Sequence, residues 1–218
     1  MFKASSGKRQ GSTTHYDPVR TRTRLLNAAF QKVYQSGFRG TDLETILKVA
    51  RVTKGALYHH FNNKEALGYA LVDEVIMGIT QEKWLRPLQE AENPIDTLAD
   101  IIQSRSTEQV ELHYGCPLNN LAQEMSPLDE GFRVRLARVF KGWRDGIAMA
   151  LRSGQKRKLV RSNINPDEIA AFLVATYEGC QSLAKMSQDV KVLRSIKANM
   201  GLYLETLRAR NAKREGAS

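Results

Sequence analysis

The sequence predicts an all-α protein of about nine helices. Apolar residues recur at spacings of three and four along most of the chain, as they do on one face of a helix. Capping residues and prolines mark successive helix starts, and no stretch alternates apolar and polar residues in the way of a strand. The chain has 218 residues, of which 42% are hydrophobic, so it is long enough to bury a sizeable core.

The N-terminal segment 1–17 is expected to be a flexible basic arm. It is rich in Ser, Thr, Gly, Lys and Arg and offers too little apolar surface to repay the entropy of ordering. From Pro18 an apolar stripe with helical spacing begins, and it stops at Gly37. The first helix is therefore predicted between these two residues, since glycine commonly follows the end of a helix.

Two short helices are predicted next. Thr41 and Glu44 fit a capping box, and the apolar stripe that follows runs to Ala50. Thr53 is a good N-cap for a third segment, Lys54–His60. Because so few residues separate the two helices, they cannot lie antiparallel and must cross steeply, as in a helix-turn-helix.

The remaining helix starts follow from caps and prolines. With Asn63 as its N-cap, Lys64 begins a long amphipathic helix that is expected to end at the break of Pro87. Four further starts are marked by Asn93-Pro94, Pro117, Pro127 and Asn165-Pro166. A last helix carries the apolar stripe Val192, Ile196, Met200, Tyr203 and Leu207.

The positive charge is concentrated in the first third of the chain. Residues 1–64 hold 12 Lys and Arg against 3 Asp and Glu, whereas residues 65–218 hold 21 against 20. A small basic part attached to a larger, nearly neutral part suggests that the small part meets a polyanion. A solvated basic face is the alternative, and attachment to a membrane surface would need a basic amphipathic helix with exposed bulky residues.

The third predicted helix has the dimensions of a probe for the DNA major groove. On a helical wheel Leu57 and Phe61 lie behind, whereas Gly55 and His59 point away from them and Tyr58 flanks the exposed face. Such a helix can offer donors to base edges while its neighbours reach phosphates. Alternatively, Tyr58 and His59 only cover the core.

These residues resemble the DNA-binding domain of TetR-type transcriptional regulators over roughly residues 19–68. The resemblance is carried by Gly37-Phe38, Thr41, Ile46, Ala50, Val52-Thr53-Lys54-Gly55-Ala56-Leu57-Tyr58-His59-His60-Phe61 and Lys64-Glu65-Ala66-Leu67. It implies an all-helical homodimer whose first three helices bind DNA and whose larger domain binds a small-molecule inducer. In the family the last two helices pair into a four-helix dimer bundle.

The resemblance also implies roles for individual residues. Phosphate-contacting positions fall on Thr41, Tyr58 and Lys64, and groove-facing positions on Thr53, Lys54, Gly55 and His59. The chain departs from the family at Arg51, where glycine is frequent in the turn. If the backbone there needs a positive φ, arginine costs on the order of 1 kcal/mol.

Two seams in the last two helices support a dimer independently of the resemblance. Ile169, Leu173, Thr176, Cys180 and Leu183 step by four and three residues, as does the Val192–Leu207 stripe. Alanines and Gly179 add sites of close approach on the earlier helix. An internal core without a dimer is the alternative interpretation of these stripes.

The segment 115–126 is similar to a motif in one branch of the family, some of whose members respond to electrophiles. The candidate pocket residues are Tyr114, Cys116, Asn120, Trp143, Phe172 and Tyr177. Cys116 precedes Pro117, and a helix N-terminus there would lower the pKa of the thiol, whereas burial would raise it. Both interpretations, a reactive sensor and a packed structural residue, remain open at this point.

The sequence lacks the residue sets that other classes of function require. No Ser/His/Asp set, carboxylate pair or phosphate loop assembles, so an enzyme is not predicted, nor is a cofactor. His113 and Cys116 have HxxC spacing, but two ligands do not make a metal site. The longest stretch without a charged residue has 12 residues, so no membrane span is predicted, and the N-terminus lacks a secretory signal. A cytoplasmic location is expected.

The combined prediction is a ligand-responsive transcriptional regulator. Its helix-turn-helix domain is placed at residues 18–66 and its ligand-binding and dimerisation domain at residues 67–218. The expected partners are a double-stranded operator with twofold-related half-sites, a small-molecule inducer and a second copy of the chain. We expect a repressor that releases DNA when the inducer binds. The alternative is a basic helical protein that binds RNA or membrane surfaces without sequence specificity.

Overall fold

The computed structural model describes residues 17–104 and 108–209. Within these ranges the regular elements are helices joined by turns and loops, and one isolated bridge links Val160 and Arg208. The helices in order are α1 (Pro18–Ser36), α2 (Leu43–Ala50), α3 (Lys54–His60), α4 (Lys64–Ala70), η1 (Leu71–Ile76), α5 (Met77–Thr80), η2 (Gln81–Leu85), α6 (Arg86–Gln89), α7 (Pro94–Gln103), α8 (Glu108–Tyr114), α9 (Pro117–Met125), α10 (Glu130–Lys156), α11 (Pro166–Ser187) and α12 (Val190–Glu205).

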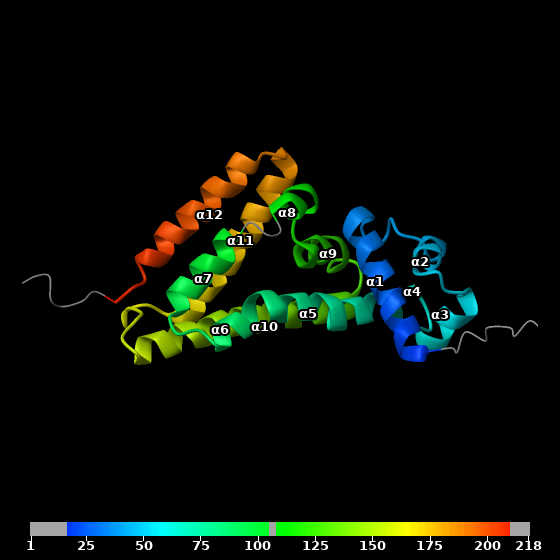
Figure 1. The fold of residues 1–218 in the computed structure, drawn as a ribbon, viewed down its shortest axis with the longest axis horizontal. Coiled ribbons are helices and arrows are strands. Elements are labelled where there is room, and N and C mark those ends of the chain that lie inside the picture. Colours follow the sequence, from blue (N-terminus) through cyan, green and yellow to red (C-terminus); the bar gives the residue numbers. More distant parts are fainter. Residues whose placement is uncertain (1–16, 105–107, 210–218) are drawn as a thin grey trace, which may run out of the picture.

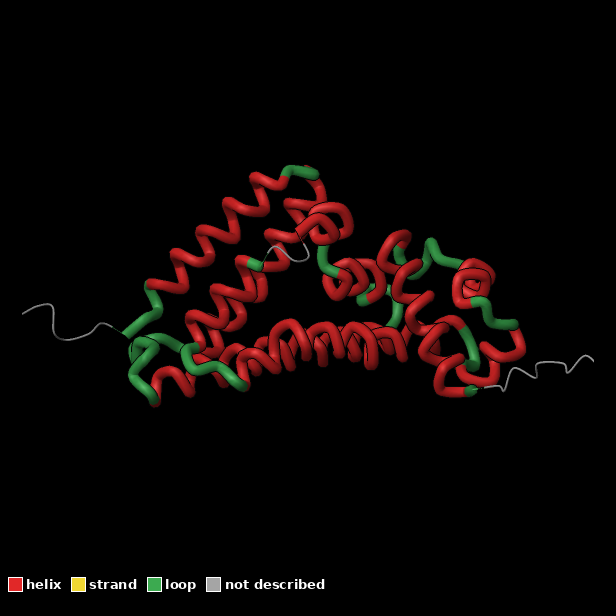
Figure 2. Tube along the Cα trace, in the orientation of Figure 1, coloured by secondary structure: helices red, strands yellow, loops and turns green. Residues whose placement is uncertain are grey.

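The helices α1 to α3 lie at one end of an elongated molecule (Figure 1). The long helix α10 runs along the rest of the molecule, and α11 and α12 rise as a packed pair, at an angle, from its far end (Figures 1 and 2). Between these two parts lie the short helices α8 and α9. The all-α prediction is confirmed, and the predicted arm 1–17 lies outside the described residues except for Asp17, which caps α1.

The small N-terminal part has its own apolar core. Its helices α1 and α3 match the predicted ranges, and the side chain of Thr53 caps α3 by accepting from Ala56 N at 3.2 Å. Leu57 and Phe61 are buried behind α3, as predicted. The cluster of buried residues comprises Leu25, Leu26, Ala28, Ala29, Ile46, Ala50, Leu57, Phe61 and Leu67. Burying this apolar face fixes how α3 is presented.

The prediction that Thr41 caps the second helix is wrong. The N-cap is Asp42, whose carboxylate accepts from Thr45 N at 2.6 Å. Asp and Thr both favour the N-cap position, and here Asp42, the residue after Thr41, occupies it. Thr41 is buried instead, and its hydroxyl donates to the Gly37 carbonyl at 2.7 Å.

The break predicted at Pro87 is also absent. Helical backbone continues from Lys64 to Gln89. The segments α4, η1, α5, η2 and α6 follow one another directly, and η1 and η2 are π-helical turns. Pro87 lies in the first turn of α6, directly after the wider turn η2. Proline is tolerated in a first turn, because the missing N–H has no obligatory partner there.

Two other differences concern the middle of the chain. The helix α10 begins at Glu130 and not at Pro127, because Asp129 provides the cap by accepting from Phe132 N at 2.8 Å. The short helix α8 is present in addition to the predicted ones. With Lys64–Gln89 counted as one helix, the described ranges hold the nine expected helices and α8.

The predicted seam of the last two helices is largely internal. Leu173, Cys180, Met200 and Leu207 are each at most 4% exposed within the single chain, so they cannot form an intermolecular contact. The outward face of α11 and α12 carries one residue of the predicted seam, Leu183, and three further apolar residues, Phe172, Met186 and Leu202, all of which are exposed. Gly179 lies on this face, and the position that a Cβ on it would occupy is open space.

The turn between α2 and α3 contains a strained arginine. Arg51 has φ 52° and ψ 49°, the left-handed conformation that favours glycine. Its carbonyl accepts from Arg24 Nη2 at 2.8 Å, a contact that does not depend on the Arg51 side chain. Arg51 therefore occupies a backbone conformation that favours glycine, the residue without a Cβ.

We expect Arg51→Gly to raise the free energy of unfolding by up to about 1 kcal/mol, because glycine relieves the strain. Urea denaturation measures the change. Arg51→Ala is the control, since alanine keeps the Cβ and should give a smaller change. A less stable Arg51→Gly protein would contradict this account of the turn.

Candidate functional site

The exposed side of α3 presents the predicted polar residues together. Thr53, Lys54, Gly55, Tyr58 and His59 are all exposed, with Tyr58 at 45%. Apart from the adjacent backbone of α3, nothing lies within 4 Å of the position that a Cβ on Gly55 would occupy, so the backbone there is open to a close approach. The face is short, polar and backed by an apolar anchor, which is the shape that fits a DNA major groove.

Two predicted phosphate contacts lie apart from that face. Thr41 is 3% exposed and its hydroxyl is used in the turn before α2. Lys64 is the first residue of α4, and its Nζ lies 4.6 Å from the centre of the Phe38 ring. The structure therefore places Lys64 at the edge of the module, where its ammonium group is partly exposed, and Thr41 inside it.

The larger part of the chain encloses a cavity of about 230 Å³. Its walls are mostly apolar and aromatic and come from α1, the helix 64–89, α8, the α8–α9 turn, α10 and α11. The aromatic wall residues are Phe30, Tyr34, Trp84, Trp143 and Tyr177. The rings of Trp84 and Trp143 lie 4.7 Å apart, and that of Tyr177 stands edge-on to Trp84 at 5.0 Å.

The six predicted pocket residues divide into four groups. Cys116, Trp143 and Tyr177 line the cavity. Asn120 lines a larger open groove of about 780 Å³ beside it, and its Nδ2 donates to the Tyr114 carbonyl at 2.6 Å. Tyr114 packs against Tyr34 behind the wall, with ring centres 5.3 Å apart.

Phe172 forms the fourth group, because the geometry places it outside both the cavity and the groove. It is 49% exposed on the outward face of α11 and packs on Tyr203, with ring centres 4.9 Å apart. Both faces of α11 carry apolar residues, so helical spacing alone did not identify the inward one. Phe172 is therefore assigned to the outer surface and not to the cavity.

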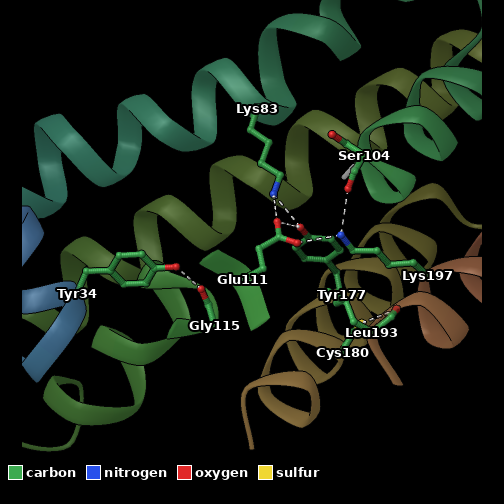
Figure 3. Close-up of polar contacts among 9 residues, drawn as sticks. All are labelled: Tyr34, Lys83, Ser104, Glu111, Gly115, Tyr177, Cys180, Leu193 and Lys197. Carbon is green, nitrogen blue, oxygen red and sulfur yellow. Dashed lines mark hydrogen bonds and ion pairs between the residues drawn. The ribbon is translucent and has the colours of Figure 1, made fainter. Parts of the chain in front are cut away.

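A buried carboxylate organises the polar end of the cavity (Figure 3). Glu111 Oε1 accepts from Lys83 Nζ at 2.7 Å and from the Tyr177 hydroxyl at 3.0 Å, and Oε2 accepts from Lys197 Nζ at 2.8 Å. Lys83 Nζ also donates to the Tyr177 oxygen at 2.8 Å. Four helical segments thus meet at one carboxylate, because η2, α8, α11 and α12 each contribute a residue.

Burial controls the ionisation of the groups beside this carboxylate. It raises the pKa of the Tyr177 hydroxyl well above its ordinary value, and neighbouring Glu111 adds to the effect. It also raises the pKa of Glu178 to about 7. Neither Glu178 oxygen has a hydrogen-bond partner among the described residues, and the same holds for both amide atoms of Gln181 and for Trp143 Nε1.

Cys116 is the N-cap residue of α9 and is followed by Pro117 in the first turn, as predicted. Its thiol makes no capping hydrogen bond. Burial raises the pKa of the thiol well above its ordinary value, and the carboxyl group of Glu178 nearby raises it further. Of the two interpretations left open by the sequence, this environment favours the packed, protonated thiol over the reactive thiolate.

Sequence reasoning missed buried polar residues at the cavity and beside it. Lys197 occurs at a core position of the α12 stripe, one turn after Leu193 and one turn before Gly201, both of which are buried. Glu178 and Gln181 stand among buried residues of α11 in the same way. A charged residue on an apolar stripe was the available signal, since such residues are rarely buried without a partner.

Two sets of contacts join the cavity wall to the N-terminal module. The Tyr34 hydroxyl, on α1, donates to the Gly115 carbonyl at 2.5 Å. Glu124, on α9, accepts from the backbone N–H groups of Phe38 and Arg39, both at 2.8 Å. A Cβ on Gly37 would stand 2.9 Å from the Glu124 carboxylate, and Gly37 has φ 77°, so glycine is required at this junction.

Two further features are absent from the described ranges, a metal-binding cluster and a helix that could span a membrane. No group of three or more His, Cys, Asp or Glu residues there could hold a metal ion. Among the helices of the same ranges, none has both the length and the apolar character that crossing a bilayer requires.

The comparisons with known proteins agree with this geometry. Residues 25–71 match the model of the bacterial regulatory proteins of the tetR family, and residues 94–200 match the model of the tetracyclin repressor-like C-terminal domain. An uncharacterized HTH-type transcriptional regulator in the lacX 3′ region of Lactococcus lactis is 32% identical over 183 residues. That match covers 83% of this chain and 91% of the relative.

Two repressors are further relatives. The HTH-type transcriptional repressor DhaR of Mycobacterium sp. is 26% identical, over 77% of this chain and 84% of its own. The crystal structure of the reduced form of NemR from Escherichia coli superimposes with a TM-score of 0.75 at 28% identity, covering 88% of this chain and 99% of that one.

We expect Lys197→Met to lower the free energy of unfolding by about 2–4 kcal/mol, because it removes one of the two ammonium groups that compensate buried Glu111. The side chains of this ion pair are only 6% and 8% exposed. Lys191→Met on the same helix is the matched control, since Lys191 is exposed and its loss should cost little. Equal urea midpoints for the two variants would contradict the structural role of Lys197.

Proposed function

The chain belongs to the TetR family of bacterial regulatory proteins, and from this premise we propose that it is a homodimeric repressor released from its operator by a small molecule in the cavity. It is a ligand-responsive, DNA-binding transcriptional regulator. The relatives DhaR and NemR are both transcriptional repressors, which supports repression over activation. The observation that carries the mechanism is that α1 both lines the cavity and forms the core behind α3.

We assign the DNA contacts to the surface around α3. Thr53, Lys54, Gly55 and His59 face the major groove, and Tyr58 and Lys64 reach the flanking phosphates. The excess of 12 basic over 3 acidic residues in the segment 1–64 supports binding to a polyanion. Thr41 contributes by fixing the turn before α2, since its hydroxyl is bound to Gly37.

The dimer is proposed to form through the outward face of α11 and α12. Exposed apolar residues are gathered there, and Gly179 and Ala175 are exposed small residues on the same stretch of α11. Small residues permit the close approach that helix packing between subunits needs. In this arrangement the two helix-turn-helix modules read half-sites related by a twofold axis.

Ligand binding is proposed to act through the junction of α1 with the α8–α9 turn. Tyr34 lines the cavity while its hydroxyl binds Gly115, so an occupant of the cavity presses on this contact. Any displacement of α1 changes the orientation of α3, because the two helices share one packed core. A ligand that prefers the displaced arrangement then lowers operator affinity by population shift.

The function is tested by selecting bound DNA from a random pool and measuring affinity for the selected site. We expect His59→Ala to relax the preference at one position of each half-site, at about 1–3 kcal/mol per lost contact. Lys64→Ala should weaken binding to all sequences alike and flatten the dependence on salt. Selection of no common sequence would overturn the proposal in favour of a nonspecific nucleic-acid binder.

We expect Tyr34→Phe to weaken operator binding about two- to tenfold, because it removes only the hydroxyl that holds α1 against Gly115. The salt dependence should be unchanged, since Tyr34 touches no phosphate in this mechanism. Tyr114→Phe is the matched control, because its ring packs on Tyr34 while no hydrogen bond of its hydroxyl supports the junction. Unaltered affinity of Tyr34→Phe, or an altered salt slope, would contradict the coupling.

A further inference from the structure

The cavity presents buried polar groups that the described chain leaves without partners. Trp143 and Gln181 are 2% and 1% exposed, and both line the cavity. The indole N–H of Trp143 and both amide atoms of Gln181 lack a hydrogen-bond partner. An unmade hydrogen bond of a buried group costs about 1–3 kcal/mol, so a ligand that provides partners gains that energy on binding.

These groups and their neighbours are mainly hydrogen-bond donors. The ammonium group of Lys83 has three N–H bonds, of which the structure directs one to Glu111 and one to Tyr177. Lys83 also lines the cavity, so its third N–H is available to an occupant. The indole of Trp143 donates only, and the Gln181 amide adds two donors on its nitrogen against one acceptor oxygen, so the available donors outnumber the acceptors. The polar end of the ligand is therefore an acceptor.

The charge balance selects among acceptors. Two ammonium groups, Lys83 and Lys197, surround the single carboxylate of Glu111, which leaves one positive charge in excess. Glu178 lies nearby, and the pKa of this buried acid is raised to about 7, so it is at least half protonated at neutral pH and below. An anionic acceptor is favoured over a neutral one in such a site.

The walls and the volume define the rest of the ligand. Aromatic rings from α1, η2, α10 and α11 surround the space and favour offset or edge-on contact with another ring. A volume of about 230 Å³ corresponds to roughly eight water molecules at their share of the liquid. One aromatic ring with a short substituent fits this space.

We propose that the cavity binds small aromatic carboxylates, with the carboxylate directed to Lys83, Trp143 Nε1 and the Gln181 amide and the ring held among Trp84, Trp143 and Tyr177. This inference names the ligand class of the cavity and rests on the proposed function. Neither the aromatic wall nor the excess of donors alone would select this class, since the first accepts any ring and the second any anion.

The proposal implies a dependence on pH through Glu178. The charged and titratable groups that act on this acid are Lys83 from η2, Glu111 from α8 and Cys116 at the start of α9. Below pH 7 Glu178 is neutral and the site carries its excess positive charge, whereas above pH 7 the ionised acid repels an anion. Affinity for a carboxylate should therefore fall as the pH rises through about 7.

Calorimetry on the full chain without DNA tests the ligand class with three probes of similar shape. Benzoate is an anion, benzamide is its neutral analogue and benzylammonium is a cation. We expect benzoate to bind at least about tenfold more tightly than benzamide, and benzylammonium to bind least. Equal binding of benzoate and benzamide, stronger binding of benzylammonium, or no binding of benzoate at millimolar concentration would each overturn the proposal.

Variants locate the binding within the cavity. Trp143→Phe keeps a ring and removes the N–H donor, and Lys83→Met removes the positive charge; both should weaken benzoate binding about tenfold or more. Lys185→Met is the matched control, because Lys185 lines the neighbouring groove but not the cavity. Unchanged benzoate affinity in Trp143→Phe and Lys83→Met would overturn the assignment.

Glu178→Gln offers a test that does not depend on removing a donor. This variant should bind benzoate with nearly the same affinity from about pH 6 to about pH 8, whereas the wild type should lose affinity over that range. An identical loss in both proteins would overturn the role of Glu178.

A separate operator-release assay keeps the two proposals distinct. Benzoate that binds without releasing DNA supports the ligand class and contradicts the proposed function.

Discussion

The architecture of the larger domain depends on compensating one buried carboxylate. Glu111 is 6% exposed, and an isolated charge at that depth would cost several kcal/mol. Two lysines and a tyrosine hydroxyl meet it from η2, α11 and α12, so these segments are held in one arrangement by a requirement that apolar packing alone does not impose. The same arrangement produces the cavity, because its polar end is the side of Lys83 and Tyr177 that faces the aromatic walls.

The cavity and the DNA-binding surface are connected because α1 belongs to both apolar cores. Leu25, Leu26 and Ala29 pack behind α3, whereas Val33 and Phe30 pack against the core of the larger domain. The backbone N–H groups after Gly37 are bound by Glu124 of α9, which fixes the end of α1. A rigid helix shared in this way transmits a change at one core to the other, because neither core can deform continuously.

The parts of this structure that sequence reasoning predicted are those with local causes. The caps Thr53, Asn63, Asn93 and Asn165 act within three residues, and each stands where it was expected. The faces of α11 were not predicted, since Leu173 and Phe172 are neighbours of similar character and only the tertiary structure decides which is buried. The carboxylate network escaped prediction for the same reason: Glu111 lies 28 residues from Lys83 and 86 from Lys197.

The uninterrupted helix Lys64–Gln89 acts as a lever, because a small tilt at one end produces a larger displacement at the other. It begins at the edge of the helix-turn-helix module and carries Lys83 and Trp84 of the cavity near its other end. At about 1.5 Å per residue its length is roughly 35–40 Å, so a tilt of about 5° at the cavity moves its first turn by about 2–3 Å. In the proposed twofold dimer the two displacements add, and the separation of the two helix-turn-helix modules changes by twice that amount. Because half-sites repeat at about 34 Å, a sub-ångström adjustment at the ligand can thus detune a fixed operator spacing.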